Sequence, residues 1–289
     1  MILIADSGST KTYWSLLHDD KTVLRYKTSG INPFFQTETQ IENQLRKQLL
    51  QQLNHFNIDS IYFFGAGCST PKQKQVVINA FEKIFYFDEI LVESDLLGAA
   101  KALCGDQPGI VCILGTGSNS GFYDGNAIVK QVAALGYIIG DEGSGAALGK
   151  KLVSDCLKNQ LSPEVQAKFF DRFKLTSAEI VENIYTKPFP SRFLASLSVF
   201  LHENLHEPEL YKIVYDSFTE FFQRNVFQYD YQQFEVNVVG SIGYYYQQVL
   251  EQVASDLHIR LGIILQAPME HLISYYQSKN DFKVKQDGI

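Results

Sequence analysis

The feature that most constrains the fold is a unit of strand and glycine-rich turn that occurs twice along the chain. In the first copy, the apolar run Ile2–Ala5 leads into Asp6–Thr12, a turn rich in glycine and hydroxyl side chains. In the second, Ile110–Leu114 leads directly into Gly115–Asn119, and a third apolar run ends at a similar turn, Gly240–Gly243. The repetition predicts an α/β protein with two duplicated lobes that face a shared cleft.

Hydrophobic periodicity predicts how the rest of the chain divides. Further buried strands are expected at 61–64, 90–92 and 259–265, and helices at 40–53, 76–84 and 96–103. The segment 104–109 has turn composition and is predicted to connect the lobes. We therefore expect an N-terminal lobe of residues 1–108 and a C-terminal lobe of residues 109–272, which carries a helical insertion at about 150–235.

Composition excludes several classes of protein. Hydrophobic residues make up 45% and charged residues 20% of the 289 residues, which indicates a globular chain. A net charge of −7 without a basic block argues against a general nucleic-acid binder. No apolar run reaches the roughly 18 residues that span a bilayer, and no signal peptide is expected because Asp6 interrupts the first apolar run.

The cysteines and histidines suggest neither a zinc site nor a disulfide framework. None of the four cysteines forms a close pair, which fits a reducing, cytoplasmic compartment. They are Cys68, Cys104, Cys112 and Cys156. The six histidines are scattered, and His202 and His206 lack the neighbouring glutamate of a metal-binding helix motif.

The turn Asp6–Thr12 has the composition of a phosphate-binding loop. Gly8 allows a ligand to approach the backbone closely, and Asp6 at the strand end could hold Mg²⁺ directly or through water. The polar groups available to an anion are those of Ser9, Thr10, Lys11 and Thr12. The alternative is a plain β-hairpin turn, because Asp, Ser and Gly are favoured turn residues.

The turn Gly115–Asn119 could also hold an anion, because two glycines two residues apart allow backbone amides to point at one ligand. A tight hairpin is again the alternative. Two well-known nucleotide motifs are absent. The nearest stretch to a Walker loop, Ser144–Lys151, lacks its first glycine, and after Gly117 the next glycine comes only at Gly121, which breaks the dinucleotide fingerprint.

Two acidic residues are candidates for chemistry. Asp95 lies between a predicted strand and a helix of small residues, where a carboxylate could accept a proton from an alcohol that attacks phosphorus. The alternative is a helix N-cap. Asp141, within Gly140–Gly145, could bind substrate hydroxyls or metal-bound water. Its alternative is an acidic cap for the helix after Ser144.

The order of these motifs resembles the BadF/BadG/BcrA/BcrD ATPase family of the actin/hexokinase/Hsp70 superfamily, and within it the N-acetylglucosamine kinases. The most specific part is Gly-Thr-Gly-Ser-Asn at 115–119, followed by Gly-Asp-Glu-Gly-Ser at 140–144. The resemblance implies two ribonuclease-H-like lobes of the actin-like ATPase fold around a nucleotide cleft. It also implies that the C-terminal helix, at about 273–289, packs back on the first lobe.

The same resemblance implies a role for each motif. The first two turns would bind the phosphates of ATP, and the third would contact adenosine. The nucleotide-binding residues would be Asp6, Gly8, Ser9, Thr10, Lys11, Thr12, Gly115, Thr116, Gly117, Gly240, Ser241 and Gly243, with Asp6 also holding Mg²⁺. Asp95 would be the catalytic base. The sugar would be bound by Asn32, Asp95, Gly117, Ser118 and Asp141.

The expected function is therefore ATP-dependent phosphorylation of a small-molecule amino sugar, with N-acetylglucosamine and its 6-phosphate as the first candidate. No nucleic acid or membrane partner is expected, and the oligomeric state stays open, a homodimer included. One alternative is an activator-type or regulatory ATPase with a protein partner, because Gly8-Ser9-Thr10 replaces the Gly-Gly-Thr that is common in sugar kinases. The other is a catalytically idle sugar- or nucleotide-binding module.

Overall fold

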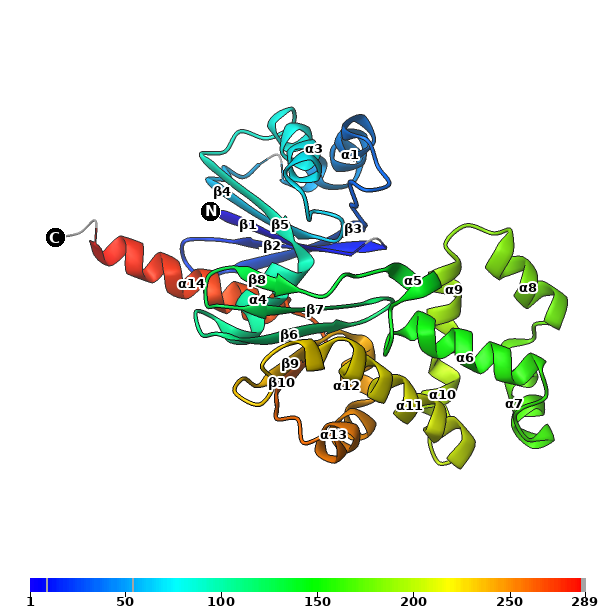
Figure 1. Cartoon of the computed structure of the whole chain (residues 1–289). Coiled ribbons are helices and arrows are strands. Elements are labelled where there is room, and N and C mark those ends of the chain that lie inside the picture. The colour runs from blue at the N-terminus through cyan, green and yellow to red at the C-terminus, as the bar shows by residue number, and fades with distance from the viewer. Residues whose placement is uncertain (9, 54, 287–289) are drawn as a thin grey trace. The chain divides into compact units, whose positions relative to one another are not determined.

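The computed structural model describes residues 1–8, 10–53 and 55–286, with side chains described as far as residue 279. The chain divides into two compact units. The first comprises Met1–Asp106 and Pro268–Ile289, and the second comprises Gln107–Ala267. Each unit contains a five-stranded mixed sheet with helices packed against it (Figure 1). The fold is therefore of the α/β class that the sequence predicts.

The sheet of the first unit has the strand order β3-β2-β1-β4-β5. Its strands are β1 Ile2–Ser7, β2 Lys11–Leu17, β3 Val23–Ser29, β4 Ser60–Gly65 and β5 Glu89–Ser94. Its helices are α1 Glu38–Leu45, α2 Gln51–Leu53, α3 Pro71–Glu82, α4 Asp95–Cys104 and α14 Met269–Gln286, with the π-helical turn Arg46–Leu50 between α1 and α2. Because β1, β4 and β5 are parallel neighbours, Ser7, Gly65 and Ser94 lie in register at one edge of the sheet.

The alternation of side chains along β1 decides which helices cover each face of this sheet. Leu3 and Ala5 point into a core shared with α1 and α3, whereas Ile2 and Ile4 point into a second core shared with α14. Figure 1 shows α1 and α3 on one side of the sheet and α4 and α14 on the other. Ser7 continues the row of Leu3 and Ala5, which explains why its side chain is buried.

The second unit repeats the strand topology of the first. Its sheet order, β10-β9-β6-β7-β8, again joins two antiparallel strands to three parallel ones. The strands are β6 Gly109–Leu114, β7 Ser118–Tyr123, β8 Ile128–Gln131, β9 Val236–Val239 and β10 Leu261–Leu265. The duplication that the two glycine turns indicate in the sequence is thus present in the order and direction of the strands.

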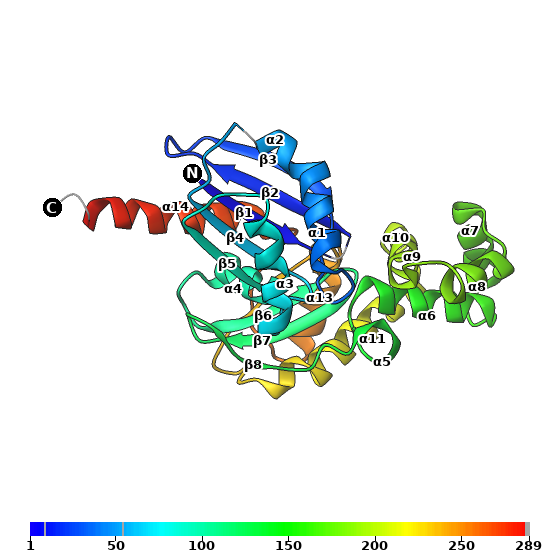
Figure 2. The same cartoon turned by 90° about the horizontal axis from the view of Figure 1, so that it is seen from above.

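Most of the second unit's helices come from the segment between β8 and β9. The helices are α5 Gly136–Ile139, α6 Gly145–Leu157, α7 Pro163–Phe173, α8 Ser177–Tyr185, α9 Pro190–Leu197, α10 Val199–Glu203, α11 Pro208–Arg224, α12 Ser241–Tyr245 and α13 Gln247–Asp256, with a 3₁₀ turn at Val226–Gln228. Figure 2 shows α7 to α10 gathered beside α6. One apolar core runs from β6 and β9 into this helical group through Leu148, Phe218 and Phe221.

Membrane insertion can be assessed from helix length and hydropathy. Among the residues that the structure describes, no helix combines the length and apolar character needed to cross a membrane.

Candidate functional site

The first unit brings Asp6 and Asp95 to the same edge of its sheet. Asp6 is the penultimate residue of β1, and Asp95 begins α4 directly after β5. Burial and, to a smaller extent, the negative charge of Asp95 together raise the pKa of Asp6 to about 7. Burial also raises the pKa of Asp95 to about 6, although its carboxylate accepts a hydrogen bond from the Leu96 N–H at 2.9 Å. This edge therefore favours a bound cation or proton.

Ser94, rather than Asp95, caps helix α4. The Ser94 side chain accepts a hydrogen bond from the Leu97 N–H at 3.2 Å, which satisfies one of the free amides at the helix start. Asp95 is the first helical residue. The N-cap alternative for Asp95 is thus wrong, because the cap is already supplied.

The first glycine turn is a tight hairpin between β1 and β2. The Gly8 N–H donates to the Lys11 carbonyl at 3.0 Å, and Gly8, Thr10 and Lys11 are all exposed. Ser9, which the resemblance assigns to the phosphates, lies outside the described residues. The hairpin and phosphate-loop interpretations are compatible, because the exposed backbone of such a turn can still contact an anion.

Thr12 differs from its predicted neighbours because its side chain is fully buried. Its hydroxyl lies 2.7 Å from the Ser7 hydroxyl and donates to the Ser29 carbonyl at 3.2 Å. The hydroxyl therefore points into the protein, in contrast to the phosphate contact expected from the sequence.

Asn32 is buried beside the loop that follows β4. Its side-chain oxygen accepts a hydrogen bond from the Phe34 N–H at 2.9 Å, and its backbone N–H donates to the Gln36 side-chain oxygen at 2.7 Å. Gly67 has a φ of +80°, and a Cβ at this position would lie 2.1 Å from the Asn32 side-chain oxygen. The backbone just before it is tied to β1, because the Ala66 N–H donates to the Ser7 carbonyl at 2.8 Å. Asn32 is thus held close to the edge that carries Asp6.

In the second unit, the glycine turn after β6 is bonded to the start of helix α6. The Gly115 N–H donates to the Gly117 carbonyl at 3.0 Å, which closes the turn. The Gly145 N–H donates to the Gly115 carbonyl at 2.8 Å, and the Ala146 N–H donates to the Thr116 carbonyl at 3.1 Å. The sequence motifs Gly115–Asn119 and Gly140–Gly145 therefore form one structure.

Asp141 lies against this turn. Its φ is +58°, and its carboxylate accepts from the Ser118 N–H at 3.2 Å. A Cβ on Gly117 would lie 2.9 Å from the Asp141 carboxylate. Burial raises the pKa of Asp141. Helix α6 is capped by Ser144, whose hydroxyl accepts from the Ala147 N–H at 3.2 Å, so the acidic-cap alternative for Asp141 is wrong.

The third glycine turn packs on the second. Gly240 has a φ of +127°, and a Cβ there would lie 2.2 Å from the Leu114 carbonyl oxygen. Ser241 is exposed at the start of α12, and Gly243 is buried against Val238. The second unit thus collects three separate glycine motifs, and the first unit collects Asp6, Asn32 and Asp95.

Comparison with known proteins identifies the class of enzyme. A solved structure from Porphyromonas gingivalis, provisionally named an N-acetylglucosamine kinase, shares 44% identity and a TM-score of 0.93 over 97% of this chain and 100% of that chain. The chain belongs to this family of sugar kinases. A curated Clostridium acetobutylicum protein named N-acetylmuramic acid/N-acetylglucosamine kinase is 24% identical over 204 residues, 67% of each chain. No family model matches the sequence.

A more distant structure places the kinase among proteins of the actin-like ATPase fold. It is a ROK family glucokinase from Streptomyces griseus, solved in complex with glucose and AMPPNP. It is 14% identical, with a TM-score of 0.55 over 94% of this chain and 97% of that chain. At this identity the likeness concerns the fold alone.

The donor set at Asp6 suits Mg²⁺ better than a cage-forming metal. In the described part of the kinase, no group of three or more His, Cys, Asp and Glu side chains could hold a metal ion. Mg²⁺ typically takes one or two carboxylates and completes its shell with water and substrate phosphates. The Asp6 carboxyl at a strand end, beside an exposed glycine turn, fits that requirement.

The cysteines lie in surroundings that disfavour the thiolate. Burial raises the pKa of Cys68 to about 12 and of Cys156 to about 11, and it raises the pKa of Cys112 as well. Because thiolates are the form that binds iron–sulfur clusters, these three residues are poor cluster ligands in this conformation. This observation weighs against the activator-type alternative.

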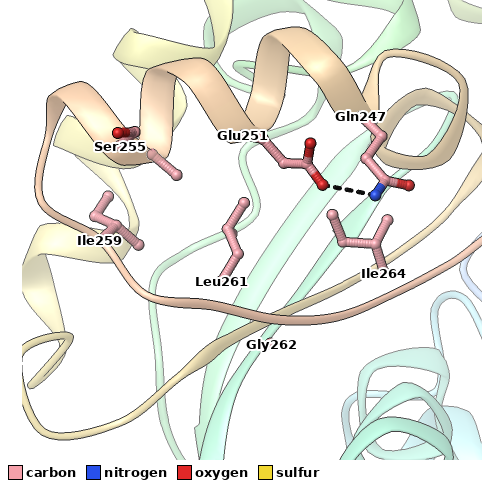
Figure 3. A pocket seen from close by; sticks show the side chains of 8 residues that line it. Gln247, Glu251, Ser255, Ile259, Leu261, Gly262 and Ile264 are labelled. Atoms are coloured by element: carbon pink, nitrogen blue, oxygen red, sulfur yellow. Dashed lines mark hydrogen bonds between the residues drawn. The ribbon is translucent and has the colours of Figure 1, made fainter.

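A hollow of about 450 Å³ lies elsewhere in the second unit, between α13 and β10. Figure 3 shows Gln247, Glu251 and Ser255 of the helix above Leu261 and Ile264 of the strand, with Gln247 bonded to Glu251. None of the described candidate site residues lines it.

Proposed function

We propose that this kinase transfers the γ-phosphoryl group of ATP to an amino sugar, with N-acetylglucosamine and its 6-phosphate as the first candidate. The proposal includes membership of the BadF/BadG/BcrA/BcrD family. The observation that carries it is Asp95, a buried carboxyl at the start of α4, directly after β5, whose pKa is raised to about 6. An ATPase that only switches shape has no need of an alcohol-activating base, whereas phosphoryl transfer to a sugar does.

The raised pKa suits Asp95 to this role. A carboxylate with a pKa of about 6 is still ionised near neutral pH, and it is a stronger base than an ordinary aspartate. In the proposed reaction it accepts the proton of the attacking sugar hydroxyl, while the oxygen of that hydroxyl bonds to phosphorus and ADP leaves.

The glycine turns are proposed to bind the nucleotide. Backbone amides of Gly8–Thr10 and of Gly115–Gly117 would contact the phosphates, and Gly240–Gly243 would contact the adenosine. Lys11 is exposed on the hairpin and would add positive charge. Mg²⁺ bound at Asp6, directly or through water, would neutralise negative charge on the phosphates.

Besides Asp95, the proposed sugar contacts are Asn32, Asp141, Gly117 and Ser118. The Asp141 carboxylate already accepts the Ser118 N–H, so its orientation is fixed before a sugar arrives. Pre-oriented polar groups of this kind lower the ordering cost of binding.

The test is a screen for sugar-dependent ADP release with N-acetylglucosamine, N-acetylmuramic acid, glucosamine and glucose, with products identified by ³¹P NMR. We expect N-acetylglucosamine to be phosphorylated. Asp95→Asn should lower the rate by about 10² to 10⁴-fold while ATP binding, measured by calorimetry, persists. Asp88→Asn changes an exposed acid just before β5 and serves as the matched control. Wild-type rates in Asp95→Asn would refute the base, and ADP release unaffected by every sugar would refute the kinase.

A further inference from the structure

Two buried hydroxyl groups connect the first glycine turn to the segment that carries Asn32. Ser7 and Thr12 are directly opposite each other across the β1–β2 hairpin, and both side chains are fully buried. Their hydroxyl oxygens are 2.7 Å apart, which is a hydrogen-bond distance. The pair lies at the base of the turn whose described residues, Gly8, Thr10 and Lys11, are exposed.

Both hydroxyls also bond to the backbone that precedes Asn32. The Ser7 hydroxyl donates to the Ile31 carbonyl at 3.1 Å and accepts from the Ile31 N–H at 3.1 Å. The Thr12 hydroxyl donates to the Ser29 carbonyl at 3.2 Å. Each hydroxyl has one proton, so when the two hydroxyls bond to each other only one of them donates to the backbone: either Thr12 donates to Ser7 and Ser7 to Ile31, or Ser7 donates to Thr12 and Thr12 to Ser29. Both arrangements bond the hairpin to the segment 29–31.

Further hydrogen bonds hold the same segment. The Gly30 N–H donates to the Thr10 carbonyl at 3.0 Å, and the Gln44 side-chain amide of α1 donates to the Ser29 carbonyl at 2.7 Å. Ile31 is fully buried in the core. The segment is therefore fixed on the hairpin up to the residue before Asn32, and Gly67 lies against the Asn32 side chain beyond it.

We propose that Ser7 and Thr12 are positioning residues that set the Asn32 side chain for the sugar and couple it to the phosphate turn. The proposal rests on the proposed function, in which Asn32 binds the acceptor. It replaces the role in phosphate binding that the resemblance implies for Thr12. A shift of the phosphate turn is transmitted through the two hydroxyls to Asn32, and a shift of Asn32 is transmitted back to the turn.

The kinetic test uses a pair of Thr12 variants that differ in the hydroxyl. Thr12→Val removes the hydroxyl and keeps the shape, whereas Thr12→Ser keeps the hydroxyl. Thr12→Val should raise the KM for N-acetylglucosamine about tenfold, because the buried Ser7 hydroxyl and the Ser29 carbonyl each lose one hydrogen-bond partner. It should change the KM for ATP by less than about twofold. Thr12→Ser should restore the KM for the sugar. A rise in the KM for ATP without a rise for the sugar would show that Thr12 binds phosphate and would overturn the proposal.

Ser15 provides a matched control on the same strand. Its hydroxyl is buried in β2 and has no hydrogen-bond partner among the residues that the structure describes. Ser15→Ala should therefore leave both KM values unchanged, whereas Ser7→Ala, which also removes a buried serine hydroxyl, should raise the KM for the sugar. Equal effects of Ser7→Ala and Ser15→Ala on the KM for the sugar would overturn the proposal. Loss of any buried hydroxyl in this sheet would then explain the change.

A measurement without substrate separates this inference from the proposed function. Hydrogen–deuterium exchange of the free protein should show faster exchange of backbone amides at 30–36 in Thr12→Val and Ser7→Ala than in wild type, Thr12→Ser and Ser15→Ala. Unchanged exchange at 30–36 would overturn the positioning role whether or not the wild type turns over a sugar. Failure of the proposed function would appear in the ADP-release screen of the wild type alone.

Discussion

Asp6 and Asp95 lie at the same edge of the first sheet, where burial and the charge of Asp95 raise the pKa of Asp6 to about 7. Two carboxyls in such surroundings destabilise each other when both are ionised. The arrangement costs stability in the free protein, and a cation or a proton relieves that cost. Such a cost is expected where a catalytic carboxylate and a cation-binding carboxylate act on one substrate.

This relationship predicts that Asp95→Asn stabilises the free protein at high pH. The folded-state pKa of about 6 lies above the ordinary value of 3.8, so the folded protein keeps a proton that the unfolded chain releases between these values. Stability is therefore lost as pH rises through about 6. The amide retains an acceptor for the Leu96 N–H and carries no charge. We expect a gain of about 1–2 kcal/mol near pH 8 and little gain near pH 4.

Urea unfolding at both pH values, without nucleotide or divalent cation, measures this difference. Asp88→Asn, which changes an exposed carboxylate, should show no gain at either pH. An equal gain for Asp95→Asn at both pH values would contradict the explanation, because the effect would then not depend on ionisation.

A second prediction concerns Gly67, which we compare with Gly105. Both have positive φ, +80° and +61°, so alanine at either position costs about 1 kcal/mol in backbone strain. A Cβ at Gly105 meets no atom of the described residues within 4 Å, whereas one at Gly67 meets the Asn32 side-chain oxygen at 2.1 Å. Gly67→Ala should therefore displace Asn32 and raise the KM for the sugar, and Gly105→Ala should affect stability alone.

Steady-state kinetics with N-acetylglucosamine and thermal unfolding of the two variants check this prediction. The changes in Tm should both be negative, with the larger drop for Gly67→Ala because the contact with Asn32 adds to the strain. If both variants kept the wild-type KM for the sugar, Asn32 would not be a sugar contact.

The sequence predicts the parallel strands of both sheets better than the antiparallel ones. β1, β4 and β6 are continuous apolar runs, because helices cover both faces of a parallel sheet. β3 and β7 were not predicted. Their sequences, Val-Leu-Arg-Tyr-Lys-Thr-Ser and Ser-Asn-Ser-Gly-Phe-Tyr, are polar, and hydrogen bonds to a neighbouring strand decide their structure. The turn expected at Gly240–Gly243 is instead one glycine followed by the short helix α12.

In the candidate site, too, local sequence patterns predict some residues, whereas others depend on contacts between distant parts of the sequence. The positions of Asp95 and Asp141 follow from local patterns of strand, turn and helix. Ser7 was overlooked, although its alternation with Leu3 and Ala5 predicts that it faces the core. The requirement for glycine at Gly67 could not be predicted, because it comes from the side chain of Asn32, which is distant in the sequence.

The last prediction tests whether Gly117 affects sugar binding through Asp141 or by contacting a ligand directly. It compares changes at the two glycines of the turn 115–117. In the part of the chain that the structure describes, a Cβ at Gly115 meets nothing within 4 Å, whereas one at Gly117 lies 2.9 Å from the Asp141 carboxylate. A carboxylate at the end of a side chain can move aside, so Gly117→Ala should barely change stability. The displaced Asp141 would lose its bond from the Ser118 N–H, and the KM for the sugar should rise by about tenfold.

A double-mutant cycle shows whether this effect acts through Asp141. In an Asp141→Ala background, Gly117→Ala should add nothing to the KM for the sugar, because the group that it displaces is already gone. Gly115→Ala should leave the KM for the sugar unchanged in both backgrounds. A full effect of Gly117→Ala without Asp141 would mean that the methyl group obstructs a ligand at the turn directly, and Asp141 would then have no part in the effect.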